Sequence, residues 1–142
     1  MTTTAKDLVA LEERLPASLA EMEFFYPRVR TLLRQELEEP ELSVVELLLR
    51  EMLNNAVCHG CHWDPRHHVR CAVDLRPDSA CLVVENDGEG FDWRRALARA
   101  ANPSAAPGHG LSILRHYASE MRYDPSGHRL TLIRELSRRE RG

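Results

Sequence analysis

The sequence predicts an α+β fold of two layers, in which a mixed, mostly antiparallel sheet carries helices on one face. Three observations predict it: long segments with apolar residues three and four positions apart, shorter apolar segments joined by tight turns, and a length of 142 residues. The first pattern is typical of helices with one buried face, and the second is typical of strands. Helices and hairpin-forming strands in this order are expected to pack as separate layers.

The length fits a single domain over residues 1–142, with a short polar tail at 137–142. Nineteen basic and 22 acidic residues give a net charge of −3, so we expect no direct contact with nucleic acid, whose binders usually carry a basic surface. Lys6 is the only lysine, which excludes a lysine-dependent phosphate loop. The chain has neither an apolar run long enough to span a membrane nor a secretory signal, so we expect a cytoplasmic protein without membrane contact.

The first two elements are expected in the N-terminal quarter. Residues 6–15 have no clear period and are interpreted as a strand that Pro16 ends. Ser18 can cap the following helix. Apolar side chains then recur at helical spacing from 19 to 37, and Pro27 marks a point where this helix can kink or break.

The second helix is the clearest element of the sequence. Ser43 followed by Glu46 is typical of a capping box at its start. The apolar residues from Val45 to Val57 form one broad face, which predicts a helix packed against the core. Gly60 is expected to end it.

The second half of the chain is expected to alternate hairpins with short helices. We predict strands at 69–75 and 80–85 with a turn at 76–79, a helix at 93–100, a mobile lid at 101–109, a helix from Gly110, and strands at 121–123 and 129–136 with a turn at 124–127. The turns contain Pro, Asp, Ser and Gly, which favour antiparallel pairing of the strands they join.

Four cysteines leave two interpretations open. Cys58, Cys61 and Cys71, together with His67, are close to the spacing of a compact zinc knuckle. Without an export signal, however, cysteines are expected to be reduced thiols. Cys71 and Cys81 also lie within apolar strand patterns, where cysteine behaves as a small buried hydrophobic residue.

Three polar residues of the second helix suggest chemistry. Glu51, Asn55 and His59 are spaced four apart, so their side chains share one face. An asparagine oxygen is a suitable ligand for Mg²⁺, and a glutamate can deprotonate a hydroxyl group. Taken alone, the same residues more often belong to a solvated helix face.

Two glycine clusters strengthen the functional interpretation. The segment 86–90, Asn-Asp-Gly-Glu-Gly, follows a predicted strand, and the segment 108–110, Gly-His-Gly, opens a predicted helix. Free N–H groups at a helix start can bind phosphate, and glycine allows a backbone to come close to a ligand. Each cluster alone is more often a turn than a site.

In this order, the segments 51–60, 86–92 and 108–111 resemble the asparagine box and the two glycine boxes of the Bergerat-fold (GHKL) ATPases. The resemblance is strongest to the stand-alone anti-sigma-factor serine/threonine kinases of the RsbW and SpoIIAB type. It covers nearly the whole chain, from Leu15 to Leu136. It implies the Bergerat ATP-binding fold, with ATP and Mg²⁺ as cofactors.

The resemblance also implies roles for single residues. Asn55 would coordinate Mg²⁺, and Glu51 would act as the catalytic base toward a serine or threonine hydroxyl group. Gly88 and Gly90 would border the adenine pocket. The full set of implied ATP-binding residues is Asn55, His59, Asn86, Asp87, Gly88, Gly90, Gly108, His109, Gly110 and Leu111.

The implied function is a serine/threonine protein kinase of a partner-switching system. Such a protein binds ATP·Mg²⁺, sequesters a sigma factor or similar target, phosphorylates a STAS-domain antagonist of the anti-sigma factor, and forms a homodimer. The alternative is a catalytically impaired Bergerat-fold binding module that acts by sequestration alone. The alternative is based on Asn86, where the family has an aspartate, and on the absence of an arginine just before Gly108.

Overall fold

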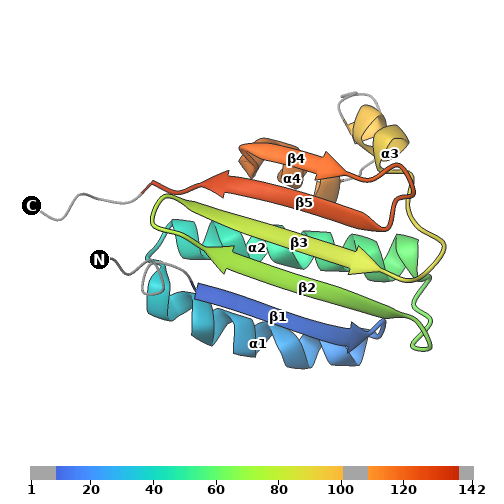
Figure 1. Ribbon diagram of the computed structural model, residues 1–142, viewed down its shortest axis with the longest axis horizontal. Coiled ribbons are helices and arrows are strands. Elements are labelled where there is room, and N and C mark those ends of the chain that lie inside the picture. Colours follow the sequence, from blue (N-terminus) through green and yellow to red (C-terminus); the bar gives the residue numbers. More distant parts are fainter. Residues whose placement is uncertain (1–8, 101–108, 138–142) are drawn as a thin grey trace, which may run out of the picture.

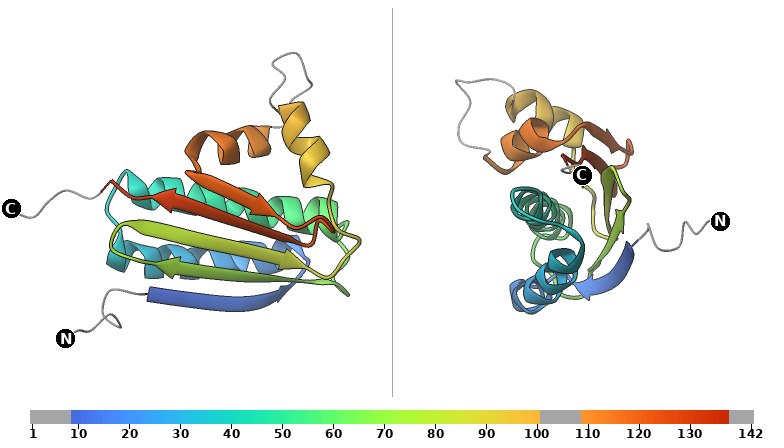
Figure 2. Two further views of the ribbon diagram at one scale, coloured as in Figure 1. Left: turned by 45° about the horizontal axis from the view of Figure 1, so that its top comes forward. Right: turned by 90° about the vertical axis from the view of Figure 1, so that its left-hand side faces the viewer.

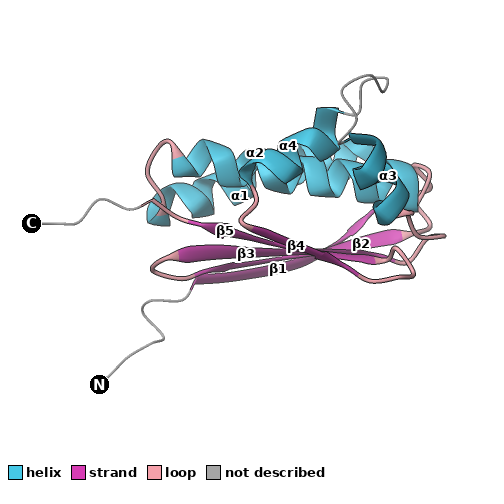
Figure 3. Cartoon of the chain, turned by 90° about the horizontal axis from the view of Figure 1, so that it is seen from above, coloured by secondary structure: helices cyan, strands magenta, loops and turns pink. Residues whose placement is uncertain are grey.

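A computed structural model describes residues 9–100 and 109–137. The elements in chain order are β1 (Val9–Pro16), α1 (Leu19–Glu36), α2 (Glu41–Asn55), the π-helical turn η2 (Ala56–Gly60), β2 (His68–Leu75), β3 (Ser79–Asn86), α3 (Trp93–Ala100), α4 (His109–Tyr117), β4 (Glu120–Tyr123) and β5 (Arg129–Glu135). Figure 1 shows their arrangement, and Figure 3 shows the four α-helices on one side of the sheet. The predicted α+β fold of two layers is confirmed.

The sheet has five strands in the order β1-β2-β3-β5-β4, and each pairing between neighbours is antiparallel. The two predicted hairpins, β2–β3 and β4–β5, are joined through the pairing of β3 with β5. Along β2 and β3, buried and partly exposed residues alternate over the whole strand. One face of the sheet therefore packs against the helices, while the other faces outward.

The core lies between the helical face of the sheet and α2, which runs between α1 and α4 (Figure 2). Leu48, Met52 and Leu53 of α2 are fully buried, as is Phe25 of α1. Burial contributes about 0.8 kcal/mol for each CH₂ group removed from water, so the central helix is firmly held. This fixes the position of the polar residues that α2 also carries.

The start of α2 differs from the prediction. The helix begins at Glu41, so Ser43 lies inside its first turn and does not cap it. Instead, the backbone N–H and the hydroxyl group of Ser43 donate to the carboxylate of Glu39, at 2.8 and 2.7 Å. The predicted capping box is wrong, because the carboxylate of Glu39 provides the acceptor that the free N–H groups of a helix start require.

The helix α1 agrees with its prediction and passes through Pro27 without a break. Ser18 caps it, since its Oγ accepts from the N–H of Glu21 at 3.4 Å. The boundaries of the other predicted elements agree within one residue where the structure describes them. Most of the predicted lid, residues 101–108, lies outside the described residues, as does 138–142. Among the helices that are described, none is long and apolar enough to cross a membrane.

A buried carboxylate ties the two layers together. Glu41, at the start of α2, accepts from Arg134 of β5 at 3.1 Å and from the N–H of Ser137 at 2.7 Å. Arg134 also donates to the carbonyl oxygen of Tyr117, at the end of α4, at 2.8 Å. Because Glu41 is buried, its charge depends on these donors in place of water.

Replacing this carboxylate is expected to destabilise the protein. Glu41→Ala leaves the guanidinium group of Arg134 and the N–H of Ser137 without their acceptor, and hydrogen bonds to charged groups contribute about 1.5–3 kcal/mol each. We expect a loss of at least this size in the free energy of unfolding, measured by urea denaturation. Glu38→Ala, at an exposed position three residues earlier, is the control. Equal losses in the two variants would contradict the prediction.

Candidate functional site

The predicted site residues of the second helix lie where α2 changes its geometry. After Asn55 the α-helix continues as the π-helical turn Ala56–Gly60, closed by a bond of 3.0 Å from the N–H of Cys61 to the carbonyl oxygen of Ala56. Turns of this kind often occur at functional sites. The sequence predicted that the second helix ends at Gly60, but no sequence pattern predicted that its last turn is π-helical.

The end of η2 meets the segment that follows β3 at two glycines, Gly60 and Gly88. A Cβ atom on Gly88 would lie 2.0 Å from the carbonyl oxygen of Gly60, and one on Gly60 would lie 2.7 Å from the side chain of Asn86. The N–H of Glu89 donates to the same carbonyl oxygen of Gly60 at 2.9 Å. Only glycine allows the two backbones to approach this closely.

Asn86 is buried beside this contact, and both ends of its carboxamide are used. Its Oδ1 accepts from the N–H of Gly88 at 3.1 Å, and its Nδ2 donates to the carbonyl oxygen of Gly127 at 3.4 Å. An aspartate would place an acceptor-only oxygen against that carbonyl oxygen. The fold around Gly127 therefore suits asparagine at this position.

Asn55 faces the interior one turn after Glu51, which is itself partly buried. The side chain of Asn55 is only 7% exposed, and its Nδ2 has no hydrogen-bond partner among the residues that the structure describes. Leaving a polar group buried without a partner costs about 1–3 kcal/mol. The geometry therefore marks Asn55 as a group that can receive a polar ligand.

His59 and Phe91 form an aromatic pair beside these residues. Their rings are stacked, with centroids 4.8 Å apart and planes at 17°. His59 is a predicted site residue, whereas sequence reasoning did not assign a role to Phe91. Gly90, with a φ of 91°, lies in the left-handed region that favours glycine and turns the chain before Phe91.

The second glycine cluster is described only in part. Gly108 lies outside the described residues, while His109, Gly110 and Leu111 form the first turn of α4. Leu114, one turn later, is fully buried, and α4 packs against α2. The predicted helix start is confirmed, and it belongs to a helix in contact with the one that carries Glu51 and Asn55.

A comparison with protein families identifies this arrangement. The model of the histidine kinase-like ATPase domain matches residues 15–134, a range that includes α2, the glycine contact and α4. The chain belongs to this family. The predicted resemblance and ATP-binding fold are confirmed, and membership implies nucleotide binding.

One curated relative of this ATPase domain is the anti-sigma F factor of Shouchella clausii (strain KSM-K16). The two are 23% identical over 86 residues, which are 58% of this chain and 59% of the relative. The chain therefore matches somewhat more than half of the length of that protein.

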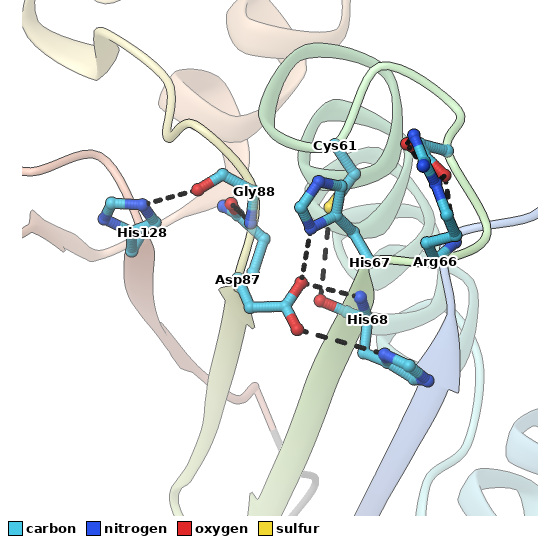
Figure 4. Close-up of polar contacts among 9 residues, drawn as sticks. Cys61, Arg66, His67, His68, Asp87, Gly88 and His128 are labelled. Carbon is cyan, nitrogen blue, oxygen red and sulfur yellow. Dashed lines mark hydrogen bonds and ion pairs between the residues drawn. The ribbon is translucent and has the colours of Figure 1, made fainter.

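Asp87, predicted to bind ATP, has its carboxylate engaged at the start of β2 (Figure 4). It accepts from the N–H of His68 at 2.7 Å and lies 3.3 Å from Nδ1 of His67. Burial alone would raise the pKa of Asp87, but the N–H of His68 and the charge of His67 outweigh it and lower the pKa below its usual range. The observed role of this carboxylate is to join the ends of β2 and β3.

The two residues after Asp87 are also held by histidines. His128 Nε2 lies 2.9 Å from the carbonyl oxygen of Gly88, and His62 Nε2 lies 3.0 Å from a carboxylate oxygen of Glu89. Because a carbonyl oxygen only accepts, Nε2 of His128 carries the proton of the first bond. The segment 87–89 of the ATPase domain is thus held from two loops that are far apart in the sequence.

The cysteines do not form the alternative zinc site. Residues 9–100 and 109–137 contain no group of three or more His, Cys, Asp or Glu side chains placed to hold a metal ion. Burial raises the pKa of Cys71 to about 12, and burial followed by the charge of Asp87 raises that of Cys61. Without a bound metal ion both thiols are therefore protonated, and the lack of a ligand cluster among the described residues is what contradicts the zinc knuckle.

The contact between Gly60 and Gly88 can be tested by adding single methyl groups. Gly88→Ala forces a Cβ into the backbone of Gly60, so we expect a loss of about 1–3 kcal/mol or more in the free energy of unfolding. Gly60→Ala meets the side chain of Asn86, which can move, so its loss should be smaller. Chemical denaturation measures the free energy of unfolding of both variants. A larger loss of stability for Gly60→Ala than for Gly88→Ala would contradict the contact between Gly60 and Gly88.

The lowered pKa of Asp87 predicts a pH-dependent stability. A carboxylate with a lowered pKa in the folded state stabilises the protein above its unfolded pKa, near 3.9, and this contribution disappears as the pH falls through the folded pKa. Asp87→Asn should therefore lower the free energy of unfolding at pH 7. The difference from the unmodified protein should shrink as the pH falls below the unfolded pKa and through the lowered folded pKa of Asp87.

Urea denaturation at several pH values across this range measures the effect. Asp78→Asn, in the exposed turn between β2 and β3, is the control and should show a smaller difference at pH 7. A difference for Asp87→Asn that persists unchanged on acidification would show that its carboxylate is not the stabilising group.

Proposed function

We propose that this ATPase domain is a serine/threonine protein kinase of a partner-switching system. It would bind ATP·Mg²⁺, sequester a sigma factor or similar regulator, and phosphorylate a serine or threonine of an antagonist protein. The observation that carries the proposal is the buried carboxamide of Asn55, one turn after Glu51, whose Nδ2 has no hydrogen-bond partner among the described residues. The close contact between Gly60 and Gly88 follows on the same helical segment. The similarity to an anti-sigma F factor supports the choice of partners.

The side chain of Asn55 fits a magnesium ion bound together with nucleotide phosphates. Mg²⁺ takes oxygen ligands and is usually held by one or two protein groups, with phosphates and water completing its shell. The assigned orientation of a carboxamide can be reversed, which would present Oδ1 where Nδ2 has no partner. Mg²⁺ bound to Asn55 would neutralise phosphate charge during transfer.

The nucleotide would lie along the ends of α2 and β3. Asn86 Oδ1 has a second lone pair beyond its bond to Gly88 and can accept from an exocyclic amino group. His59, stacked on Phe91, is exposed at the edge of this region. We propose that Asp87 acts indirectly, by holding the segment to which Gly88 belongs. Gly90 and residues 108–111 complete the proposed binding set.

Glu51 would act as the catalytic base. As the hydroxyl oxygen of the acceptor attacks the γ-phosphorus, the carboxylate of Glu51 takes the hydroxyl proton. A bond forms between that oxygen and phosphorus, the bond from phosphorus to the bridging oxygen breaks, and ADP leaves with the electron pair. Such a reaction requires mainly positioning and charge neutralisation. The helix α2 can provide the positioning because it is held in the core.

A binding module without catalysis is the second candidate function. It is favoured by Asn86, since a neutral carboxamide makes weaker hydrogen bonds than a carboxylate. The groups of Asn86 are also partly engaged by Gly88 and Gly127. Such a protein would regulate its target by sequestration alone.

Nucleotide binding is tested by isothermal titration calorimetry with ATP and ADP, with and without Mg²⁺. Asn55→Ala should weaken Mg²⁺-dependent binding by at least about tenfold, because it removes the proposed ligand. Asn54→Ala changes an exposed neighbour on the same helix and should leave binding close to that of the unmodified protein. Equal affinities of the two variants for Mg·ATP would contradict the role of Asn55.

Catalysis is tested by transfer of labelled phosphate from ATP to a purified STAS-domain antagonist. Glu51→Gln keeps the shape of the side chain but removes the base, so transfer should slow by about 10²–10⁴-fold. Nucleotide binding should be retained. Transfer at the original rate would rule out Glu51 as the base. Sequestration of the target that persists in a protein with no transfer activity would favour the binding module.

A further inference from the structure

A hollow of about 260 Å³ lies between α1 and α2, and we call it the α1–α2 groove. Its apolar and aromatic walls are formed by Leu19, Met22 and Tyr26 of α1, Leu47 of α2, and Trp63, and its polar lining includes Glu51 of α2. Pockets for small molecules usually measure about 300–1,000 Å³. The α1–α2 groove is therefore too small for a nucleotide and suits one large side chain.

Two apolar side chains of the groove are open to solvent. Leu19 is 57% exposed and Trp63 is 42% exposed. Trp63 and the preceding His62 both have positive φ, 58° and 53°, a conformation that costs about 1–2 kcal/mol per residue. The N–H of Trp63 donates to the carbonyl oxygen of Val57 at 3.0 Å, which helps to hold this loop at the groove. An exposed indole beside an exposed leucine is typical of an interaction surface.

The charges around the groove disfavour an acidic occupant. Its lining includes the carboxylates of Glu23 and Glu51 and only one basic group, Arg50. The guanidinium group of Arg50 lies 4.4 Å from the ring centroid of Tyr26. Burial raises the pKa of Tyr26 to about 12, so its phenol remains neutral. A neutral or basic segment is therefore complementary to the groove.

Glu51 connects the groove with the proposed chemistry. Leu47, Glu51 and Asn54 are spaced by four and three residues, so they form one stripe of α2 that faces the groove. Asn55 follows Glu51 by one turn and is buried, on a helix that packs against β3. Glu51 therefore stands between the groove and the proposed nucleotide site.

We propose that the α1–α2 groove docks the segment of the protein substrate that carries the phosphorylated hydroxyl group. The segment would insert an apolar side chain between Leu19 and Trp63, within about three residues of its serine or threonine, and would carry no acidic residue there. When that apolar side chain occupies the groove, the hydroxyl group of the neighbouring serine or threonine lies within reach of Glu51. This inference rests on the proposed kinase function and names the substrate feature that such a kinase would select.

Docking can be measured without catalysis through the fluorescence of Trp63. The chain has two tryptophans, so Trp93→Phe leaves Trp63 as the only one. The probes are nine-residue peptides with a central serine, in which one flanking position at a time is Leu, Lys, Ala or Glu. Peptides with leucine near the serine should change the emission of Trp63 and bind at least tenfold more tightly than their Glu counterparts.

Two exposed apolar positions of α1 provide a matched pair of variants. Leu19→Arg, in the groove, should abolish the preference for leucine. Phe24→Arg, at a residue that is 71% exposed and does not line the groove, should leave that preference intact. No response of Trp63 to any peptide, or a response independent of the flanking residues, would overturn the docking proposal.

Transfer of labelled phosphate to the same peptides separates this proposal from the kinase function. Leu19→Arg should raise the KM for leucine-containing peptides with little change in kcat. Phosphorylation without preference for leucine would overturn the groove proposal and leave the kinase function standing. Binding of leucine-containing peptides without any phosphorylation would contradict the kinase function and overturn the assignment of the bound segment as its substrate.

A second copy of the chain is the competing occupant. Sedimentation equilibrium measures whether the protein forms a dimer. If Leu19→Arg dissociates a dimer and Phe24→Arg does not, the groove is an interface between copies, and the substrate proposal is overturned. If Leu19→Arg, Phe24→Arg and the unmodified protein have the same molar mass in solution, the groove is not an interface between copies and is open to substrate.

Discussion

The candidate site depends on one backbone contact, the approach of Gly60 at the end of α2 to Gly88 after β3. A Cβ at Gly88 would lie 2.0 Å from the carbonyl oxygen of Gly60, which instead accepts from the N–H of Glu89 at 2.9 Å. This contact joins a helix of one layer to a strand of the other without an intervening side chain. It sets the spacing between Asn55 and Asn86, whose carboxamides come from different layers. Both could rotate locally, but neither can move away unless the contact breaks.

The turn between β4 and β5 supports the same contact from the opposite side. Asp124 organises this turn by accepting from the N–H groups of His128 and Arg129, both at 2.9 Å, and from the hydroxyl of Ser126 at 2.5 Å. Burial opposes the charge of Asp124, but these donors outweigh it and lower its pKa. His128, placed in this way, donates to the carbonyl oxygen of Gly88. A carboxylate in a distant turn therefore positions the glycine segment.

Periodicity predicted the elements of the fold well, because burial of one face dominates helices such as α2 and strands such as β2 and β3. The family was predictable because the segments 51–60, 86–92 and 108–111 resemble the motifs of a known family. The capping box failed because α2 begins two residues before Ser43, which donates to the carboxylate of Glu39 and does not act as the cap. The stacking of His59 on Phe91 and the pairing of Asp87 with β2 join residues distant in sequence, and local patterns contain no signal for them.

The two sides of α2 explain how one helix could serve both substrates of a kinase. Asn55 is buried, whereas Glu51, four residues or about 6 Å earlier along the axis, lines the α1–α2 groove. A base must reach the acceptor hydroxyl while that oxygen faces the phosphate. As the proposed base, Glu51 lies on the boundary between the two proposed sites and would meet this requirement without moving. Because α2 is anchored by its buried apolar face, the distance between the two sites is set by the helix itself and not by a flexible loop.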